Sequence, residues 1–148
     1  MKLHSLAAIA LAFCTAFAAC TKESYSHDAT NLPQKAKTTL SQNFTAAVSV
    51  VKVEKSGLGG TEEYEVVLTN GTEITFKANG DWESVETPNN IAVPSGLVPT
   101  AITNFVREKH AGALIVGIDK EKNGFDVELS NGLEIKFDKG GNFVAYDK

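Results

Sequence analysis

The sequence contains the same short stretch twice. Residues 68–76 are LTNGTEITF and residues 129–137 are LSNGLEIKF, so six of nine positions are identical at a spacing of 61 residues. Upstream, an apolar residue followed by proline occurs at 32–33 and again at 98–99, at a spacing of 66. The five-residue difference is assigned to an extra loop at 56–61, SGLGGT. Because an internal repeat constrains architecture more strongly than residue propensities do, the chain is predicted to be one small unit made twice.

Each copy is predicted to be a helix followed by antiparallel strands. Pro33 and Pro99 are placed at the first helical position, where the missing amide proton has no partner to lose. The β-branched runs at 48–54 and 114–119 predict the first long strand of each copy. Apolar residues behind each proline recur at helical spacing: Ala36, Leu40 and Phe44 in the first copy, and Ile102, Phe105 and Val106 in the second.

The Asn-Gly turns, Asn70-Gly71 and Asn131-Gly132, set the register of the next hairpin in each copy. A two-residue loop would mix apolar and charged side chains on both sheet faces, whereas a three-residue loop makes one face wholly apolar. We therefore predict three-residue loops with Gly71 and Gly132 in the left-handed conformation. The expected pairs are Tyr64 with Phe76, Val66 with Ile74, Phe125 with Phe137, and Val127 with Ile135.

A third strand of each copy is expected to bring Trp82 and Phe143 over these phenylalanines. The predicted fold class is thus α+β, with two tandem αββββ repeats and the helices on one sheet face. Repeat 1 is assigned to residues 32–86 and repeat 2 to residues 97–148, joined by a linker at 87–96. A unit of about 60 residues buries little core alone, so the repeats are expected to pack together or share one sheet.

The N-terminus has the pattern of an export signal. Lys2 precedes an apolar run that is too short to span a bilayer and ends in small residues, so residues 1–19 are predicted to be a signal peptide. Cleavage by a general signal peptidase would release a soluble protein. Alternatively, residues 17–20 (FAAC) are similar to the lipobox of bacterial lipoproteins, which would make Cys20 the lipid-bearing terminus and the only membrane contact. Residues 20–31 are polar and unpatterned and are assigned to a tether.

Cysteine content and charge exclude several classes of protein. Cys14 lies within the signal peptide and Cys20 at its end, so the mature domain has no disulfide framework and no cysteine-based metal site. The formal charge is −4 and becomes one unit more negative when Lys2 is removed. This acidic balance argues against a nucleic-acid partner, which requires a basic face.

The mature sequence contains few residues of the kinds that catalysis requires. Outside the predicted signal peptide, the only histidines are His27, in the tether, and His110, which ends the second helix where Phe44 ends the first. No zinc motif is present, and the glycine-rich residues 57–60 lack the Lys-Ser/Thr ending of a phosphate-binding loop. The chain is therefore predicted to be no enzyme and to need no cofactor or metal.

Side-chain alternation predicts which residues lie on the sheet face opposite the helices. This face is either a solvated outer surface or a docking surface for a protein, with valines and a tyrosine as apolar anchors among charges. Glu128 and Glu134 would face each other across two strands and repel, so calcium or a basic partner would relieve them. The candidate partner-binding residues are Glu65, Val67, Glu73, Thr75, Glu83, Val85, Glu128, Glu134, Lys136, Val144 and Tyr146.

The repeated pattern resembles a known family. An apolar residue with proline, an amphipathic helix, a β-branched strand, then LxNGxEIxF and a glycine-led aromatic strand are similar to the exported PepSY-like, β-lactamase-inhibitor-like proteins of Bacteroidetes. The resemblance spans essentially the whole mature chain. It implies the fold of the β-lactamase inhibitory protein, whose helices cover one side of a curved sheet while the other side grips the enzyme. That inhibitor carries disulfides, which this mature chain cannot form internally. The shared motifs are structural and leave activity open.

Two functions follow as hypotheses. The first is an exported, non-catalytic binding module with an envelope protein partner, an inhibitor of a hydrolase or peptidase that acts through the open sheet face. The alternative is a small-ligand or cation sensor in the cell envelope. Either function would place the protein in the periplasm or at the outer membrane.

Overall fold

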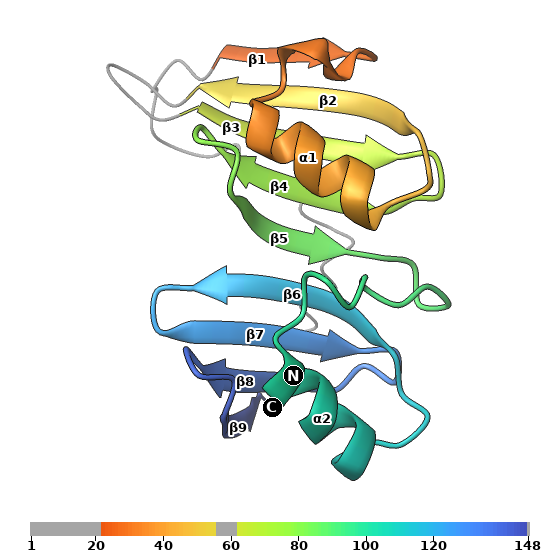
Figure 1. Ribbon diagram of the computed structural model, residues 1–148, viewed down its shortest axis with the longest axis vertical. Coiled ribbons are helices and arrows are strands. Elements are labelled where there is room, and N and C mark those ends of the chain that lie inside the picture. Colours follow the sequence, from red (N-terminus) through yellow and green to blue (C-terminus); the bar gives the residue numbers. More distant parts are fainter. Residues whose placement is uncertain (1–21, 56–61, 148) are drawn as a thin grey trace, which may run out of the picture.

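The computed structural model describes residues 22–55 and 62–147, which form nine strands and two α-helices (Figure 1). The predicted signal peptide, Cys20 and the extra loop at 56–61 lie outside the described residues. The first half contains β1 (Lys22–Ser26), a short 3-10 turn η2 (Ala29–Asn31), α1 (Gln34–Asn43), β2 (Val48–Lys55), β3 (Glu62–Leu68), β4 (Glu73–Lys77) and β5 (Trp82–Glu86). The second half contains α2 (Thr100–Lys109), β6 (Ile115–Glu121), β7 (Gly124–Leu129), β8 (Glu134–Asp138) and β9 (Phe143–Asp147).

All nine strands pair antiparallel in sequence order, so the two repeats share one continuous sheet. Both helices lie on the same face of this sheet (Figure 1), and we call the other side the open face. The α+β class and the one-sided helical layer are thereby confirmed. No helix in the part of the chain that the structure describes has the length and apolar character needed to cross a membrane.

The repeats join where β5 pairs with β6, through Ser84 with Asp119, Val85 with Ile118 and Glu86 with Gly117. On the helix side of this junction, the Lys120 ammonium lies 3.5 Å from the centroid of the Trp82 ring. The predicted linker, residues 87–96, forms neither helix nor strand and is tied to β6 by backbone hydrogen bonds. The junction is therefore a packed part of the sheet.

The helices bury the predicted apolar stripes. Each helix begins one residue after its proline, so Pro33 and Pro99 are the N-cap residues and not the first helical residues as predicted. Ala36 and Ile102 are fully buried against the sheet. Further core side chains come from both repeats and form one cluster: Val66, Leu68, Ile74, Phe76, Val85, Ile118, Val127, Leu129, Ile135 and Phe137.

The hairpin loops have the predicted length and conformation. The Leu68 amide donates to the Thr72 carbonyl at 2.8 Å, and the Leu129 amide donates to the Leu133 carbonyl at 2.9 Å. Gly71 has φ +85° and Gly132 has φ +79°. The side chains of Asn70 and Asn131 accept a hydrogen bond from the amide two residues later. All four predicted cross-strand pairs are present: Tyr64 with Phe76, Val66 with Ile74, Phe125 with Phe137, and Val127 with Ile135.

The structure corrects the prediction for part of the tether. Residues 22–26 form β1, which pairs with the outer edge of β2, with Ser24 opposite Val53 and Ser26 opposite Val51. The sequence KESYS shows no alternation of apolar and polar residues, so it does not predict a strand. The strand forms because its backbone pairs with the exposed edge of β2.

A β-bulge in each repeat overturns part of the predicted open face. Thr75 pairs with Ser84 but Phe76 pairs with Trp82, so Glu83 is an extra residue on β5. Beyond the bulge the alternation is reversed, and Val85 is 0% exposed in the core. The prediction that Val85 lies on the open face is therefore wrong.

The same irregularity lies between β8 and β9, where Phe137 pairs with Phe143 and Ile135 pairs with Tyr146. Tyr146 consequently lies on the helix side, and its ring contacts His110 at the end of α2 with 5.6 Å between ring centroids. The predicted open-face position of Tyr146 is also wrong. A prediction from strict period-two alternation does not include a bulge. One extra residue moves every later side chain of the strand to the opposite face.

Replacing Thr72 with valine is expected to stabilise the chain by about 1 kcal/mol. Thr72 is 0% exposed, and its hydroxyl has no hydrogen-bond partner among the described residues. Valine keeps the branched shape and removes the desolvation cost of that hydroxyl. Urea unfolding measures the change, with Thr75→Val on the open face as the matched control. A lower unfolding midpoint for Thr72→Val would contradict this assignment.

Candidate functional site

A row of carboxylates crosses the open face. The cross-strand pairs follow one another as Glu73 with Glu86, Glu86 with Gly117, Gly117 with Glu128, and Glu128 with Glu134. Asp147 then pairs with Glu134. We call these five acidic residues (Glu73, Glu86, Glu128, Glu134 and Asp147) the acidic strip. Like charges directly opposite one another destabilise a sheet, so this arrangement is a cost to the fold.

The strongest electrostatic perturbation lies where the repeats meet. The pKa of Glu86 is raised to about 8, mainly by burial and in addition by the neighbouring charges of Asp119 and Glu73. Burial also raises the pKa of Glu73 and of Glu128, and in Glu128 the facing Glu134 adds to the effect. These carboxyl groups are too crowded and too poorly hydrated to ionise together as easily as exposed ones.

Asp119 extends this region onto the adjacent row. Burial raises its pKa, while the hydrogen bond donated by the Ser84 hydroxyl lowers it. Its partner on β7 is Asp126, so a second pair of carboxylates lies directly opposite beside the strip. In the second repeat, carboxylates therefore lie directly opposite one another in two adjacent rows.

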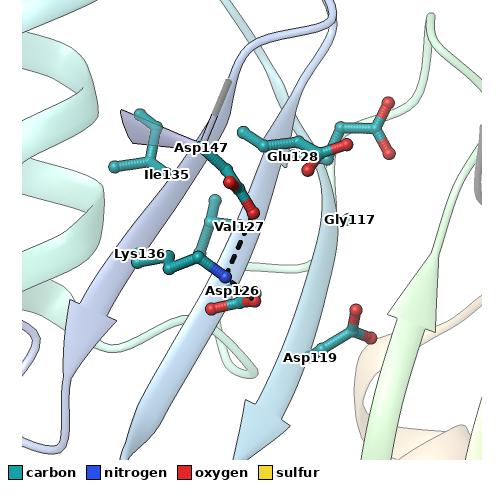
Figure 2. A pocket seen from close by; sticks show the side chains of 9 residues that line it. Gly117, Asp119, Asp126, Val127, Glu128, Ile135, Lys136 and Asp147 are labelled. Atoms are coloured by element: carbon teal, nitrogen blue, oxygen red, sulfur yellow. Dashed lines mark hydrogen bonds and ion pairs between the residues drawn. The ribbon is translucent and has the colours of Figure 1, made fainter. Parts of the chain in front are cut away.

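A hollow of about 150 Å³ opens beside the strip (Figure 2). Gly117 lies in its wall and contributes no side chain. In the first repeat the corresponding position is Val50, which pairs with Val67 as Gly117 pairs with Glu128. The remaining lining residues are Asp119, Asp126, Val127, Glu128, Glu134, Ile135, Lys136 and Asp147.

One ammonium group is already bound in this hollow. Lys136 Nζ lies 2.9 Å from Asp126 Oδ2 and 3.1 Å from Asp147 Oδ2, between the two carboxylates in Figure 2. The hydrogen bonds to Asp126 and Asp147 raise the pKa of Lys136 above its usual value. The hollow thus stabilises a protonated amine by two charge-assisted hydrogen bonds.

The first repeat has a more balanced open face. Lys52 pairs with Glu54 and lies 3.9 Å from Glu65, and Lys77 lies 3.1 Å from Glu83. The two repeats share a backbone but differ in charge, because Lys52 of the first corresponds to Asp119 of the second by strand register. At this position the first repeat therefore carries an ammonium group and the second repeat a carboxylate.

Most predicted site residues lie on the open face, and three important ones were missed. Strand register and ion pairing place there Glu65, Val67, Glu73, Thr75, Glu83, Glu128, Glu134 and Lys136. Val144 stands at the second bulge and is 59% exposed. Glu86, Asp119 and Asp147 were not predicted. A usable signal existed for Glu86 and Asp147, because each ends its strand at the same distance from the repeated phenylalanine.

The histidines have structural contacts. His27 Nδ1 lies 2.7 Å from the Ser49 carbonyl oxygen, and His110 Nε2 lies 3.1 Å from the Tyr146 hydroxyl. Within residues 22–55 and 62–147, no group of three or more histidine, cysteine or acidic side chains converges to hold a metal ion. The chemistry that the site offers is the binding of positive charge.

The fold and this face define an α+β protein with a one-sided helical layer and an acidic open sheet. A family model described as putative beta-lactamase-inhibitor-like, PepSY-like matches residues 62–145, which is more than half of the chain. The chain belongs to this PepSY-like family. No protein with a curated description is significantly similar to it.

Solved structures from Bacteroides have the same fold. A putative periplasmic protein of unknown function from Bacteroides vulgatus is 30% identical, with a TM-score of 0.79 over 86% of this chain and 100% of its own. A putative calcium-regulated periplasmic protein from Bacteroides thetaiotaomicron is 31% identical, with a TM-score of 0.77 over 85% of this chain and 97% of its own. A further putative periplasmic protein from Bacteroides vulgatus is 32% identical, with a TM-score of 0.76 over 89% of this chain and 100% of its own.

Proposed function

We propose that this chain is a non-catalytic binding module of the cell envelope, whose open face binds a positively charged segment of another envelope protein. The observation that carries the proposal is the Lys136 ammonium group, which is held by Asp126 and by Asp147 of the acidic strip. It is an internal example of the group that the face is suited to bind. A lysine or arginine side chain of a partner would meet the same kind of carboxylate pair along the strip.

The size of the hollow favours a side chain over a free small molecule. Its volume is about 150 Å³, whereas pockets for small ligands occupy roughly 300 to 1,000 Å³. Val67 and Thr75 lie among the charges and provide contact area without adding to the repulsion.

The raised pKa values support a cationic partner for an energetic reason. Glu86, Glu73 and Glu128 all lie in a row of like charges, and ionising them is costly in the unbound chain. A nearby cation lowers the pKa of a carboxyl group and removes that repulsion. Binding of a cationic segment is therefore expected to reduce the repulsion within the acidic strip and so to stabilise the folded chain.

The relatives support the envelope location and one specific form of the function. The similar Bacteroides proteins are described as periplasmic, which agrees with the predicted signal peptide at residues 1–19. The family description suggests an inhibitor, so the partner proposed is a hydrolase or peptidase with a basic segment at its surface. Its activity would be reduced when that segment is held on the open face.

A direct binding measurement tests the charge preference. A fluorescent peptide rich in lysine and arginine is titrated with the chain, and its anisotropy is recorded at low and high salt. We expect binding to weaken at least about tenfold in the double variant Glu128→Lys with Glu134→Lys, because two facing carboxylates of the strip are replaced by positive charges. High salt should weaken binding to the wild-type chain as well.

Two controls make the result specific. Glu108→Lys changes the charge by the same amount per residue on the exposed surface of α2 and should bind as the wild type does. Gly117→Val fills the hollow with the side chain that the first repeat carries at Val50, and should weaken binding without reversing any charge. Equal peptide affinity for the wild type and the double variant would refute the proposal.

A small-ligand or cation sensor is the second candidate, because one similar structure is described as calcium-regulated. Carboxylates are the ligands that calcium prefers. The described residues nevertheless contain no converging group of three or more possible ligands, and the Lys136 ammonium occupies the space between Asp126 and Asp147. The residues do not fit a preformed calcium site. Thermal unfolding with calcium or magnesium tests this, and a shift with calcium alone would favour the second candidate.

A further inference from the structure

The two edges of the sheet are unlike. One edge is β1, which covers β2, and the other edge is β9, which pairs with β8. On the outer side of β9, no strand pairs among the residues that the structure describes. The corresponding strand of the first repeat, β5, is paired on both sides because β6 follows it in the sheet.

The internal repeat allows the outer edge of β9 to be compared with the corresponding edge of β5. Val85 of β5 pairs with Ile74, and Tyr146 of β9 pairs with Ile135, after the same bulge in each repeat. Residues 84–86, which pair with β6, therefore correspond to residues 145–147. Val85 is 0% exposed, whereas Tyr146 is 44% exposed. The second repeat thus ends in a strand of the kind that is covered in the first.

Exposed apolar side chains gather at this edge. Phe143, Val144 and Tyr146 on β9 are 41%, 59% and 44% exposed. Exposed apolar groups that lie together mark interaction sites more often than scattered ones do. A strand edge with such side chains is an unprotected pairing surface.

The aromatic side chains at the edge are held in place. The Phe143 ring stacks on Phe105 with 5.1 Å between centroids, and its centroid lies 4.9 Å from that of Tyr146. His110 hydrogen-bonds the Tyr146 hydroxyl from the end of α2. A partner strand would therefore meet an ordered surface, which reduces the entropy lost on association.

We propose that β9 pairs antiparallel with β9 of a second copy of this chain, which extends the sheet across a two-fold axis. Register about Tyr146 places it opposite Tyr146 of the partner subunit and places Ala145 opposite Asp147 of the partner subunit. Three residue pairs then form the junction, the same number as join β5 to β6. The contact is isologous and closes at two copies.

Charge and topology favour a second copy over other arrangements. Each Asp147 faces the small Ala145 of the partner subunit, so no like charges lie directly opposite across the junction. A head-to-tail chain would need the outer edge of β2, the counterpart of β6, but β1 already covers that edge. The proposed contact leaves the open face accessible, so it is independent of the proposed binding of a cationic segment.

Sedimentation equilibrium of the mature chain tests the association. We expect a monomer–dimer equilibrium for the wild type, and at least about tenfold weaker dimerisation for Tyr146→Lys, because a charged edge residue disfavours strand pairing. Tyr25→Lys is the matched control, since Tyr25 is 66% exposed on the opposite edge strand. A wild-type chain that is monomeric throughout, or a dimer weakened only by Tyr25→Lys, would overturn the proposal.

A cysteine cross-link tests the register even if Tyr146→Lys unfolds the chain. In a Cys20→Ser background, Tyr146→Cys places two thiols directly opposite across the two-fold axis, within the distance that a disulfide requires. Mild oxidation should give a covalent dimer. Lys122→Cys, in the exposed turn between β6 and β7, should remain monomeric. Equal cross-linking of the two variants would refute the β9 pairing, and unchanged peptide binding by the covalent dimer would show that the two surfaces are separate.

Discussion

Val85→Asp is expected to unfold most of the chain, with a loss of about 4 kcal/mol or more of unfolding free energy. Val85 is 0% exposed and lies between Ile74 and Ile118, at the strand pair that joins the two repeats. A carboxylate there would be buried among apolar side chains of the core and would lose its hydration. Since a domain of this size is stable by only about 5 to 15 kcal/mol, such a loss removes much of its margin.

The matched control lies two residues earlier. Glu83 occupies the bulge on the same strand and contacts Lys77 on the open face. Glu83→Val should change the unfolding free energy by less than about 1 kcal/mol, because an exposed ion pair contributes little. Circular dichroism and urea unfolding compare the two variants. If Val85→Asp were as stable as Glu83→Val, the bulge would be absent and Val85 would lie on the open face.

The second large effect is a pH dependence that Glu86 controls. Its pKa is about 8 in the folded chain, against an ordinary value of 4.5. A group that holds its proton more tightly when folded stabilises the fold at low pH, and that stability is lost as pH rises from the unfolded pKa to the folded one. The chain should therefore become less stable between about pH 4.5 and pH 8. After allowance for solvent screening at this partly exposed site, we expect a loss of about 2 kcal/mol.

Urea unfolding at several pH values measures this loss. Glu86→Gln should reduce the slope to the smaller one that the raised pKa values of Asp119, Glu73 and Glu128 leave. It should also be more stable than the wild type near pH 8, because the crowded charge of Glu86 is gone. Glu108→Gln on α2 should retain the wild-type slope. Asp81 and Asp138 have lowered pKa values through their hydrogen bonds, so they act below pH 4 and do not obscure this window. A Glu86→Gln variant with the wild-type slope would show that another group controls the dependence.

The acidic strip and the bulges are linked. Without the extra residue on β5, Val85 would replace Glu86 on the open face, and without the one on β9, Tyr146 would replace Asp147. One inserted position per repeat therefore exchanges an apolar side chain for a carboxylate in the same row. This explains why Glu86 and Asp147 lie in the acidic strip, where Val85 and Tyr146 were predicted as apolar anchors.

Several features follow from local chemistry and are present in the sequence itself. The Asn-Gly loops require left-handed glycines at Gly71 and Gly132, and only the three-residue loop keeps one face apolar, so the hairpin register was predictable. The apolar stripes behind Pro33 and Pro99 identify the two helices because helical spacing is a property of contiguous residues. The α+β class and the repeat follow from these elements.

Other features depend on contacts between residues far apart in the chain, and only the tertiary structure decided them. Strand β1 exists because β2 offers an edge, and the bulges at Glu83 and Val144 arise from packing β5 and β9 onto their neighbours. The gathering of Glu86, Asp119 and Glu128 around Gly117 depends on β5 pairing with β6, across a linker that carries no register information. Local sequence determined the elements, and long-range pairing determined which charges meet, because cross-strand register is set by the whole sheet.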